Sequence, residues 1–182
     1  MNKKQKDILL KLARKSILEE FGEKFDLNKY KIDDFSKKQG AFVTLTKKGN
    51  LRGCIGFVEG IFPLYETIYR AAKAAAFEDP RFPELKKEEI NNIKIEISVL
   101  SIPQEIKAEN PEDCIKQIKI GENGLIIKKG YASGLLLPQV FPEYDADSKM
   151  ALEMTCKKAG LPKDSWKEGA KVFKFQAEVF SE

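Results

Sequence analysis

The sequence predicts an α+β fold, with mainly antiparallel sheets and helices packed on them. Strand-like segments occur mostly in hairpin pairs, and helical segments are interspersed irregularly instead of alternating with the strands one for one. The length of 182 residues suits one domain or two small lobes that share a core. A composition of 42% hydrophobic and 33% charged residues is that of an ordinary folded protein.

The chain is predicted to begin with a helix that is followed by a β-hairpin. Apolar residues recur at helical spacing over residues 3–21, which indicates an amphipathic helix. The segments 41–45 and 52–58 are rich in β-forming residues and are separated by the turn "KKGN". We expect Gly49 and Asn50 to supply the positive φ angles that a hairpin turn requires.

A second helix and a long strand are predicted next. Residues 62–77 are rich in alanine, and Pro63 suits the first turn of a helix. The two prolines of "EDPRFPEL" end that helix, and "KKEEINN" is expected to form a short one. Isoleucine and valine alternate with mostly polar residues over 93–100, as in a half-buried strand.

The second half of the chain has further helix and strand signals. Asn110 and Pro111 have residue types typical of a helix cap and of the first helical position. Residues 120–130 are predicted as strand, turn and strand, and 133–141 as a short strand ended by Pro138. The remaining predictions are a helix at 147–159 with Gly160 after its end, and a strand at 171–180 with Phe173, Phe175, Ala177 and Val179 facing inward.

The absence of histidine removes several kinds of active site. Without imidazole the chain has no Ser-His-Asp or Cys-His arrangement and no zinc site with histidine ligands. Its three cysteines, Cys54, Cys114 and Cys156, form no CxxC pair, and no phosphate-binding loop joins a strand to a helix. We therefore expect no metal and no cofactor.

Charge and hydrophobicity limit the partners. The net charge of +4 comes from 32 basic and 28 acidic residues that are mixed along the chain. We expect the basic residues of the first helix to form a solvated face, so nucleic-acid binding is the least favoured function. No apolar run approaches the roughly 18 residues of a membrane helix, and the N-terminus lacks the features of a signal peptide. Together with unpaired cysteines, this predicts a cytoplasmic protein without membrane contact.

The segment "LRGCIGF" is unusual for a strand because it contains a charge, a thiol and two glycines. Alternation puts Arg52, Cys54 and Gly56 on one face, and Leu51, Gly53, Ile55 and Phe57 on the other. The second set, apart from its glycine, is suited to a core. Glycines inside a strand often mark a close approach to the backbone, so we expect the first face to form the floor of a cleft.

Two interpretations of Arg52 and Cys54 stay open. Their side chains would lie within about 7 Å of each other, and a guanidinium there would favour the thiolate and lower the pKa of the cysteine. Arg52 would then bind an anionic group beside a nucleophilic or redox thiol. Alternatively, Cys54 is a small buried apolar residue and Arg52 braces the fold in an ion pair. A carboxylate is expected near Arg52 in both cases, because burying an unpaired arginine is costly.

Two further segments supply candidate polar groups. In "FEDPRF", Glu78 or Asp79 would pair with Arg52 or act as the general base that histidine cannot provide, with Arg81 beside them. Alternatively, this segment is a helix-ending turn with local ion pairs. In "LLLPQV", Gln139 would present its amide to a ligand or satisfy backbone groups near the proline.

Taken in order, several segments resemble the AMMECR domain family, whose hallmark is "LRGCIG". They are "GAFVTL", "LRGCIGF", "AAFEDPRFPEL", "ISVLS", "IGENGLII", "GLLLPQV" and "CKKAGLP", and the resemblance covers residues 40–180. The positions that match family motifs are Arg52, Gly53, Cys54, Ile55, Gly56, Glu78, Asp79, Arg81, Phe82, Pro138 and Gln139. Some relatives have a histidine where Asn123 stands here, so a mechanism that requires it cannot operate in this chain.

The resemblance implies one domain over residues 1–182, made of two unequal lobes with the larger built from both ends of the chain. It implies that the "LRGCIG" strand borders a cleft between the lobes. It also implies partners, since family members in bacteria and archaea are often linked with Memo-like and radical SAM proteins. The family has no established reaction.

Two functions are therefore expected. In the first, the chain is a small enzyme or enzyme subunit in which Arg52 binds an anion, Cys54 supplies a thiol, and Glu78 or Asp79 handles protons. In the second, the same cleft belongs to a non-catalytic adaptor that receives a partner's peptide. A small anionic ligand or a peptide would contact Arg52, Gly53, Gly56, Arg81 and Gln139.

Overall fold

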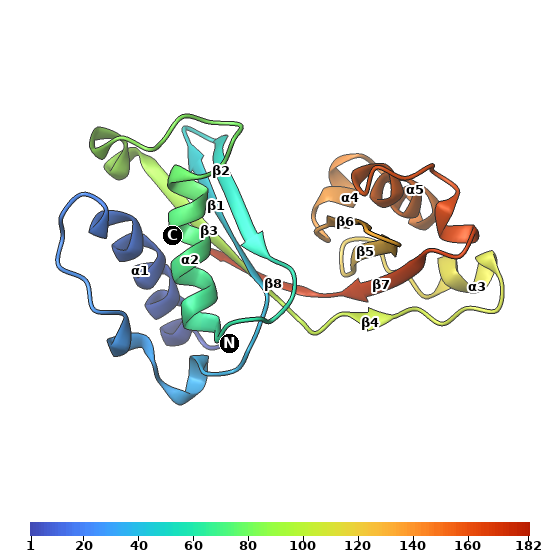
Figure 1. Cartoon of the computed structure of the whole chain (residues 1–182), viewed down its shortest axis with the longest axis horizontal. Coiled ribbons are helices and arrows are strands. Elements are labelled where there is room, and N and C mark those ends of the chain that lie inside the picture. The colour runs from blue at the N-terminus through green and yellow to red at the C-terminus, as the bar shows by residue number, and fades with distance from the viewer. The chain divides into compact units, whose positions relative to one another are not determined.

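The computed structural model describes residues 1–182 and contains two four-stranded antiparallel sheets with helices packed on them (Figure 1). The predicted α+β class is confirmed. The chain forms two compact units, of which the first is Met1–Leu100 with Glu178–Glu182 and the second is Ser101–Ala177. None of the helices combines the length and the hydrophobicity that crossing a bilayer requires.

The first unit is one sheet with helices on one face. Its strands are β1 (Ala41–Lys47), β2 (Asn50–Phe57), β3 (Ile93–Leu100) and β8 (Ala177–Ser181), in the order β2-β1-β3-β8. The helices are α1 (Lys3–Glu19) and α2 (Leu64–Phe77), with short 3₁₀ helices at Leu27–Tyr30, Asp33–Phe35 and Lys87–Asn92. Alternate residues of the sheet are buried in one core with both helices: Ala41, Val43 and Leu45 of β1 and Ile93, Ile95, Ile97 and Val99 of β3.

Small residues let α2 approach β2 closely. The buried face of α2 includes four alanines, Ala71, Ala72, Ala75 and Ala76. A Cβ atom at Gly53 of β2 would lie 2.0 Å from the carbonyl oxygen of Ala75, so the backbones meet where neither strand nor helix has a bulky side chain. This contact places the "LRGCIG" strand against the helix, and Gly53 therefore faces the core as predicted.

The β1–β2 turn differs from its prediction. Positive φ angles occur at Lys48 (51°) and Gly49 (82°), whereas Asn50 is already the first residue of β2. The turn therefore lies one residue earlier in the chain than the glycine–asparagine pair suggested.

A β-bulge also interrupts the pairing of β1 and β2. Leu45 pairs with Gly53 and Thr46 with Leu51, so Arg52 is an extra residue in β2. The alternation predicted for this strand is wrong at its start, because the bulge leaves Leu51 exposed (44%) instead of facing the core.

The second unit is a sheet with its own helices and core. Its strands are β4 (Gln104–Glu105), β5 (Gly124–Lys129), β6 (Ala132–Leu136) and β7 (Lys171–Phe175), in the order β4-β7-β5-β6. Its helices are α3 (Pro111–Lys116), α4 (Val140–Glu143) and α5 (Ser148–Lys158), with a 3₁₀ helix at Ser165–Lys167. The predicted cap at Asn110 and the positive φ of Gly160 after α5 are both confirmed.

Three predictions for the second half are corrected. Residues 120–123 form a turn and not a strand, and α4 occupies part of the segment predicted as strand 133–141. The predicted strand 171–180 is two strands, β7 and β8, which belong to different sheets and are separated at Gln176. After the change of sheet the expected alternation fails, since Val179 is 41% exposed, whereas within β7 both Val172 and Phe175 are buried.

The first prediction concerns Gly53, which we replace by alanine. The new methyl group would clash with backbone atoms of α2, which cannot rotate away, so we expect a loss of about 2 to 3 kcal/mol in the free energy of unfolding, measured by urea denaturation. The matched control is Gly130→Ala, where the φ of 59° is unfavourable but the space is open, with an expected loss of about 1 kcal/mol. Equal losses in the two variants would contradict the close approach of α2.

Candidate functional site

The outer edge of β2 is occupied at Cys54 by two side chains. Since β2 is an edge strand paired only with β1, half of its backbone groups face away from the sheet. The Cys54 amide donates to Oδ2 of Asp79 at 2.8 Å, and the Cys54 carbonyl accepts from Nη2 of Arg81 at 3.1 Å. Asp79 and Arg81 thus take the place that a neighbouring strand would have at Cys54.

Asp79 and Arg81 also hold each other. Nε and Nη2 of Arg81 donate to the two carboxylate oxygens of Asp79 at 2.9 and 2.7 Å, and the Arg81 amide donates to Oδ1 at 3.1 Å. Asp79 is 4% exposed, whereas the Arg81 side chain is 53% exposed. The Arg81 guanidinium and the backbone amides of Cys54 and Arg81 hold the pKa of the Asp79 carboxyl far below its usual range.

These contacts limit what the predicted carboxylates can do. Asp79 is a fixed, ionised acceptor whose oxygens are already used, so it is unsuited to the general-base role expected for it. Glu78 is exposed at the end of α2. Neither residue pairs with Arg52, so that expected pairing is wrong.

The carboxylate expected near Arg52 is Glu89. Nε and Nη2 of Arg52 donate to the two Glu89 oxygens at 3.2 and 3.0 Å, and Nη2 also donates to the Glu84 carbonyl at 3.3 Å. Glu89 receives further bonds from Nζ of Lys47 at 2.8 Å and from the Lys86 amide at 3.0 Å. The Arg52 guanidinium, followed by Lys47, lowers the pKa of Glu89 to about 2.

Arg52 therefore braces the fold, in agreement with the second interpretation of the sequence. It is 9% exposed, and only its Nη1 atom is buried without a hydrogen-bond partner. The sequence did not distinguish Glu89 from the adjacent Glu88. Which of the two reaches Arg52 depends on the 3₁₀ helix that places Glu89 toward β2.

The Cys54 thiol lies between a hydroxyl group and a guanidinium. The Thr44 hydroxyl, directly across from it on β1, donates to Sγ at 3.3 Å. This guanidinium belongs to Arg81 and not, as predicted, to Arg52. The hydrogen bond to Asp79 is the main cause that raises the pKa of Arg81, and the Cys54 side chain is close enough to raise that pKa further. As a residue, Cys54 is half-buried.

The other two cysteines have different surroundings. Cys114 and Cys156 are buried in the core of the second unit. Burial raises the pKa of both thiols. Of the three cysteines, Cys54 is therefore the one that is not fully buried.

Both glycines of the motif are explained by packing. Gly53 admits α2, as described above. A Cβ atom at Gly56 would lie 2.5 Å from the ring of Phe42 and 2.4 Å from the Ala41 carbonyl oxygen. The space next to Gly56 is therefore filled by the Phe42 side chain of β1. The ligand contacts expected at Gly53 and Gly56 stay predictions.

Gln139 belongs to the second unit, where it immediately precedes α4. Its Oε1 atom is buried without a hydrogen-bond partner, so its amide does not satisfy the backbone groups near Pro138 through that atom. Its grouping with Arg52 and Cys54 stays a prediction.

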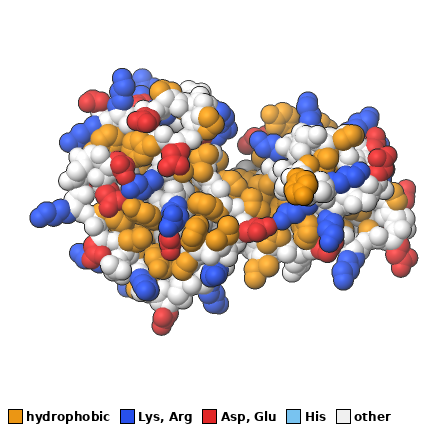
Figure 2. Space-filling model, in the orientation of Figure 1, with side chains coloured by type: hydrophobic (Ala, Val, Ile, Leu, Met, Phe, Trp, Pro, Cys, Tyr) orange, Lys and Arg blue, Asp and Glu red, His pale blue; other side chains and the backbone are white.

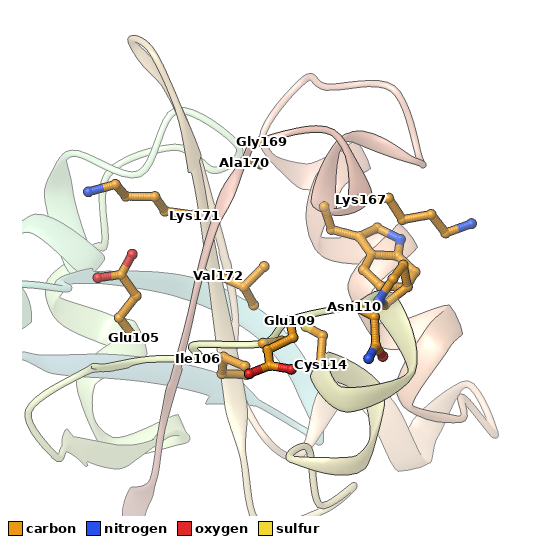
Figure 3. Close-up of a pocket in the computed structure, with 13 residues that line it drawn as sticks. Glu105, Ile106, Glu109, Asn110, Cys114, Lys167, Gly169, Ala170, Lys171 and Val172 are labelled. Atoms are coloured by element: carbon orange, nitrogen blue, oxygen red, sulfur yellow. The ribbon is translucent and has the colours of Figure 1, made fainter.

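Two pockets of the second unit contain none of the predicted site residues. One, of about 270 Å³, is drawn in Figure 3, where Glu105 and Lys171 lie together on one side of the view and Cys114, Asn110 and Lys167 on the other. The second, of about 470 Å³, is lined by Ser101, Ile102, Gln104, Gln117, Lys119, Glu122, Asn123, Lys174, Phe175 and Gln176. No group of three or more Cys, Asp or Glu side chains is arranged to hold a metal ion.

Comparisons with known proteins support the family resemblance that the order of the sequence motifs indicated. The AMMECR1 family model matches residues 10–180. A protein of Methanothermobacter thermautotrophicus is 45% identical over 177 residues, which are 96% of this chain and 92% of that protein. A protein of Saccharolobus solfataricus is 48% identical over 182 residues, covering 96% of this chain and 80% of its own.

A solved structure is also similar. The crystal structure of the uncharacterized protein PH0010 from Pyrococcus horikoshii matches with a TM-score of 0.88 and 45% identity, over 96% of this chain and 90% of that one. None of these proteins is described with an activity.

The second prediction tests the Arg52–Glu89 pair with Glu89→Gln. Because the pKa of Glu89 falls from 4.5 to about 2 on folding, its ionised form stabilises the protein above pH 4.5, and this stabilisation is lost as the pH falls through the folded value. We expect the variant to lose about 3 kcal/mol in the free energy of unfolding at neutral pH. The difference from the wild type should shrink toward zero near pH 2, measured by urea denaturation at each pH.

The neighbouring Glu88→Gln is the control, since Glu88 is exposed and its side chain has no ion pair with Arg52. Its loss should stay within about 0.5 kcal/mol at every pH. A loss in Glu89→Gln that does not change with pH would contradict the ion pair as its cause.

Proposed function

We propose that this chain, which belongs to the AMMECR1 family, is a small enzyme or enzyme subunit whose reactive group is the Cys54 thiol. The observation that carries the proposal is the position of that thiol. Cys54 is half-buried, and its sulfur accepts a hydrogen bond from Thr44 and lies near the Arg81 guanidinium. A hydroxyl donor and a cation both favour the thiolate, which is the nucleophilic form of cysteine.

The geometry changes which residues take the expected roles. Arg81, with its half-exposed side chain, is better placed than Arg52 to bind an anionic group or a developing oxyanion beside the sulfur. Asp79 keeps the Arg81 guanidinium in place. Since that carboxylate also neutralises much of the positive charge, the Arg81–Asp79 pair favours the thiolate less than a free arginine would. Glu78 stays the proposed proton-handling carboxylate of this segment.

The chemistry that suits these groups is attack of the thiolate on an electrophilic carbon, such as an acyl carbonyl. The sulfur–carbon bond forms, the leaving group departs with its electron pair, and Arg81 stabilises the oxyanion of the intermediate. Water or an acceptor molecule then releases the product and restores the thiolate. This sequence needs no oxidant.

The proposed setting follows the family resemblance, with Memo-like and radical SAM proteins in the same pathway and a small anionic molecule or a peptide as the ligand. Nucleic acid is not part of the proposal. On the face drawn in Figure 2, Lys and Arg side chains are interspersed with Asp and Glu side chains on each unit, without the single-sign patch of a nucleic-acid binder.

A non-catalytic adaptor is the second candidate, and one observation favours it. Four residues of the family motifs, Arg52, Gly53, Gly56 and Asp79, have contacts inside the first unit that explain their presence without any reaction. An adaptor needs these residues only to shape β2 and the segment beside it. Under this alternative, the Cys54 thiol has no special reactivity.

The third prediction separates these candidates by the rate at which Cys54 reacts with iodoacetamide at neutral pH, followed by mass spectrometry of peptides. The enzyme proposal expects Cys54 to react at least about threefold faster in the folded chain than in a synthetic peptide of residues 50–58, because the fold favours the thiolate. The buried Cys114 and Cys156 are internal controls and should react at least about tenfold more slowly than Cys54. A folded-chain rate at or below that of the peptide would favour the adaptor.

A further inference from the structure

The larger pocket of the second unit is lined mainly by polar side chains. Its volume of about 470 Å³ lies within the range of small-molecule sites, and all of its lining residues belong to that unit. It contains none of the groups that the proposed thiol chemistry uses. A ligand of this pocket is therefore independent of the reactivity of Cys54.

The pocket lies where the core-facing side of the second sheet changes from apolar to polar. Ile127 of β5 and Val172 of β7 are cross-strand partners in the core of this unit. Two residues further along β7, on the same face, Lys174 lies directly across from Leu125 of β5 and from Gln104 of β4. An ammonium group and an amide therefore occupy positions on a face that is otherwise apolar.

Lys174 has hydrogen-bonding capacity that the protein does not use. Its Nζ donates to the carbonyl of Gln117, the residue at the end of α3, at 3.0 Å. This bond uses one of the three N–H groups of the ammonium, and Lys174 forms no ion pair. The one carboxylate that lines the pocket, that of Glu122, lies 3.7 Å from Nζ of Lys119 instead. A half-buried ammonium without a counter-ion favours an anion from outside the chain.

Asn123 offers two further donors in a fixed direction. Its Oδ1 accepts from the Lys119 amide at 2.9 Å, and its own amide donates to the Lys119 carbonyl at 2.9 Å, which closes the turn before β5. Because a backbone N–H holds the oxygen, the Nδ2 group points away from that amide. The residue is only 8% exposed, yet Nδ2 has no partner in the protein and is not sealed from solvent. A buried side chain that lines a pocket with unused N–H groups indicates an acceptor in that pocket.

We infer that this pocket binds a small molecule through an anionic oxygen group, either a carboxylate or a phosphate. Nζ of Lys174 and Nδ2 of Asn123 donate to the ligand, and such hydrogen bonds to a charged group are stronger than neutral ones. The exposed side chains of Gln104 and Gln176 contact its polar remainder. Two lysines and one glutamate line the pocket, so its charge favours an acidic ligand over a basic one.

The fourth prediction concerns titration of the full chain with inorganic phosphate and, separately, with succinate, followed by nitrogen–proton correlation NMR. We expect the side-chain amide signal of Asn123 and the backbone amide signals of the lining residues to shift in a saturable way with at least one of these anions. Sodium chloride at the same ionic strength should not reproduce the shifts, because screening alone saturates no site. The anion that binds more tightly identifies the group that the ligand carries.

Two variants should weaken this binding. Asn123→Asp keeps an oxygen for the Lys119 amide but replaces the two donors by a negative charge, and Lys174→Met keeps the length of the side chain but removes the ammonium. In each, we expect the dissociation constant to rise at least about tenfold, the effect of losing a hydrogen bond to a charged group. The control is Lys116→Met, an exposed lysine of α3 outside the pocket. It changes the net charge equally, and its dissociation constant should stay within about twofold of the wild type.

The outcomes decide for or against the site. Saturable shifts that both pocket variants weaken and that the control keeps support it. Shifts that do not saturate, that sodium chloride reproduces, or that the control weakens as much as the pocket variants overturn it. If Lys174→Met fails to fold because α3 loses its contact, Asn123→Asp decides, and an unchanged affinity in that variant overturns the site. None of these results depends on whether Cys54 is reactive.

Discussion

The local geometry of the candidate site depends on the Asp79 carboxylate. It is buried, and it binds three groups at once: the Cys54 amide, the Arg81 amide and the Arg81 guanidinium. An ionised carboxylate in a buried position is tolerated only with such partners. The same bonds that keep Asp79 charged fix the backbone of β2 at Cys54 and hold Arg81 beside the thiol.

One connecting segment supports most of this edge. The residues between α2 and β3 supply Asp79, the Glu84 carbonyl and Glu89, and these hold β2 at two successive points. Edge strands that stay open tend to pair with other chains, and ion pairs along an edge prevent this. The polar residues of "LRGCIG" and "EDPR" thus stabilise the edge of the sheet in the folded protein. The Cys54 side chain points to the sheet face instead, so these contacts leave its sulfur beside Thr44.

Much of the fold could be predicted because its signals are local. Alternating isoleucines identified β3 with its full range, and the cap and proline at the start of α3 placed that helix correctly. The split of 171–180 into β7 and β8 could not be predicted, because periodicity within a strand does not say which sheet it joins. The bulge at Arg52 was missed for a similar reason, since it depends on the pairing of two strands.

The candidate site could be predicted only in part. A carboxylate near Arg52 followed from the cost of burying a lone charge, but its identity as Glu89 depends on the path of the chain after α2. Thr44 gave no signal, because a threonine in an alternating strand is ordinary β-sheet surface. Only the register of β1 with β2 brings its hydroxyl next to the Cys54 thiol.

The most direct test of this account is hydrogen exchange at the Cys54 amide, measured by NMR in the wild type and in Asp79→Ala. In the structure this amide has no acceptor on β1 and is bonded only to Asp79. The account predicts that the amide is protected in the wild type and that its exchange accelerates at least about tenfold in the variant, while the buried Val43 amide of β1 changes much less. A Cys54 amide that exchanges freely in the wild type, or equally slowly in both proteins, would contradict it.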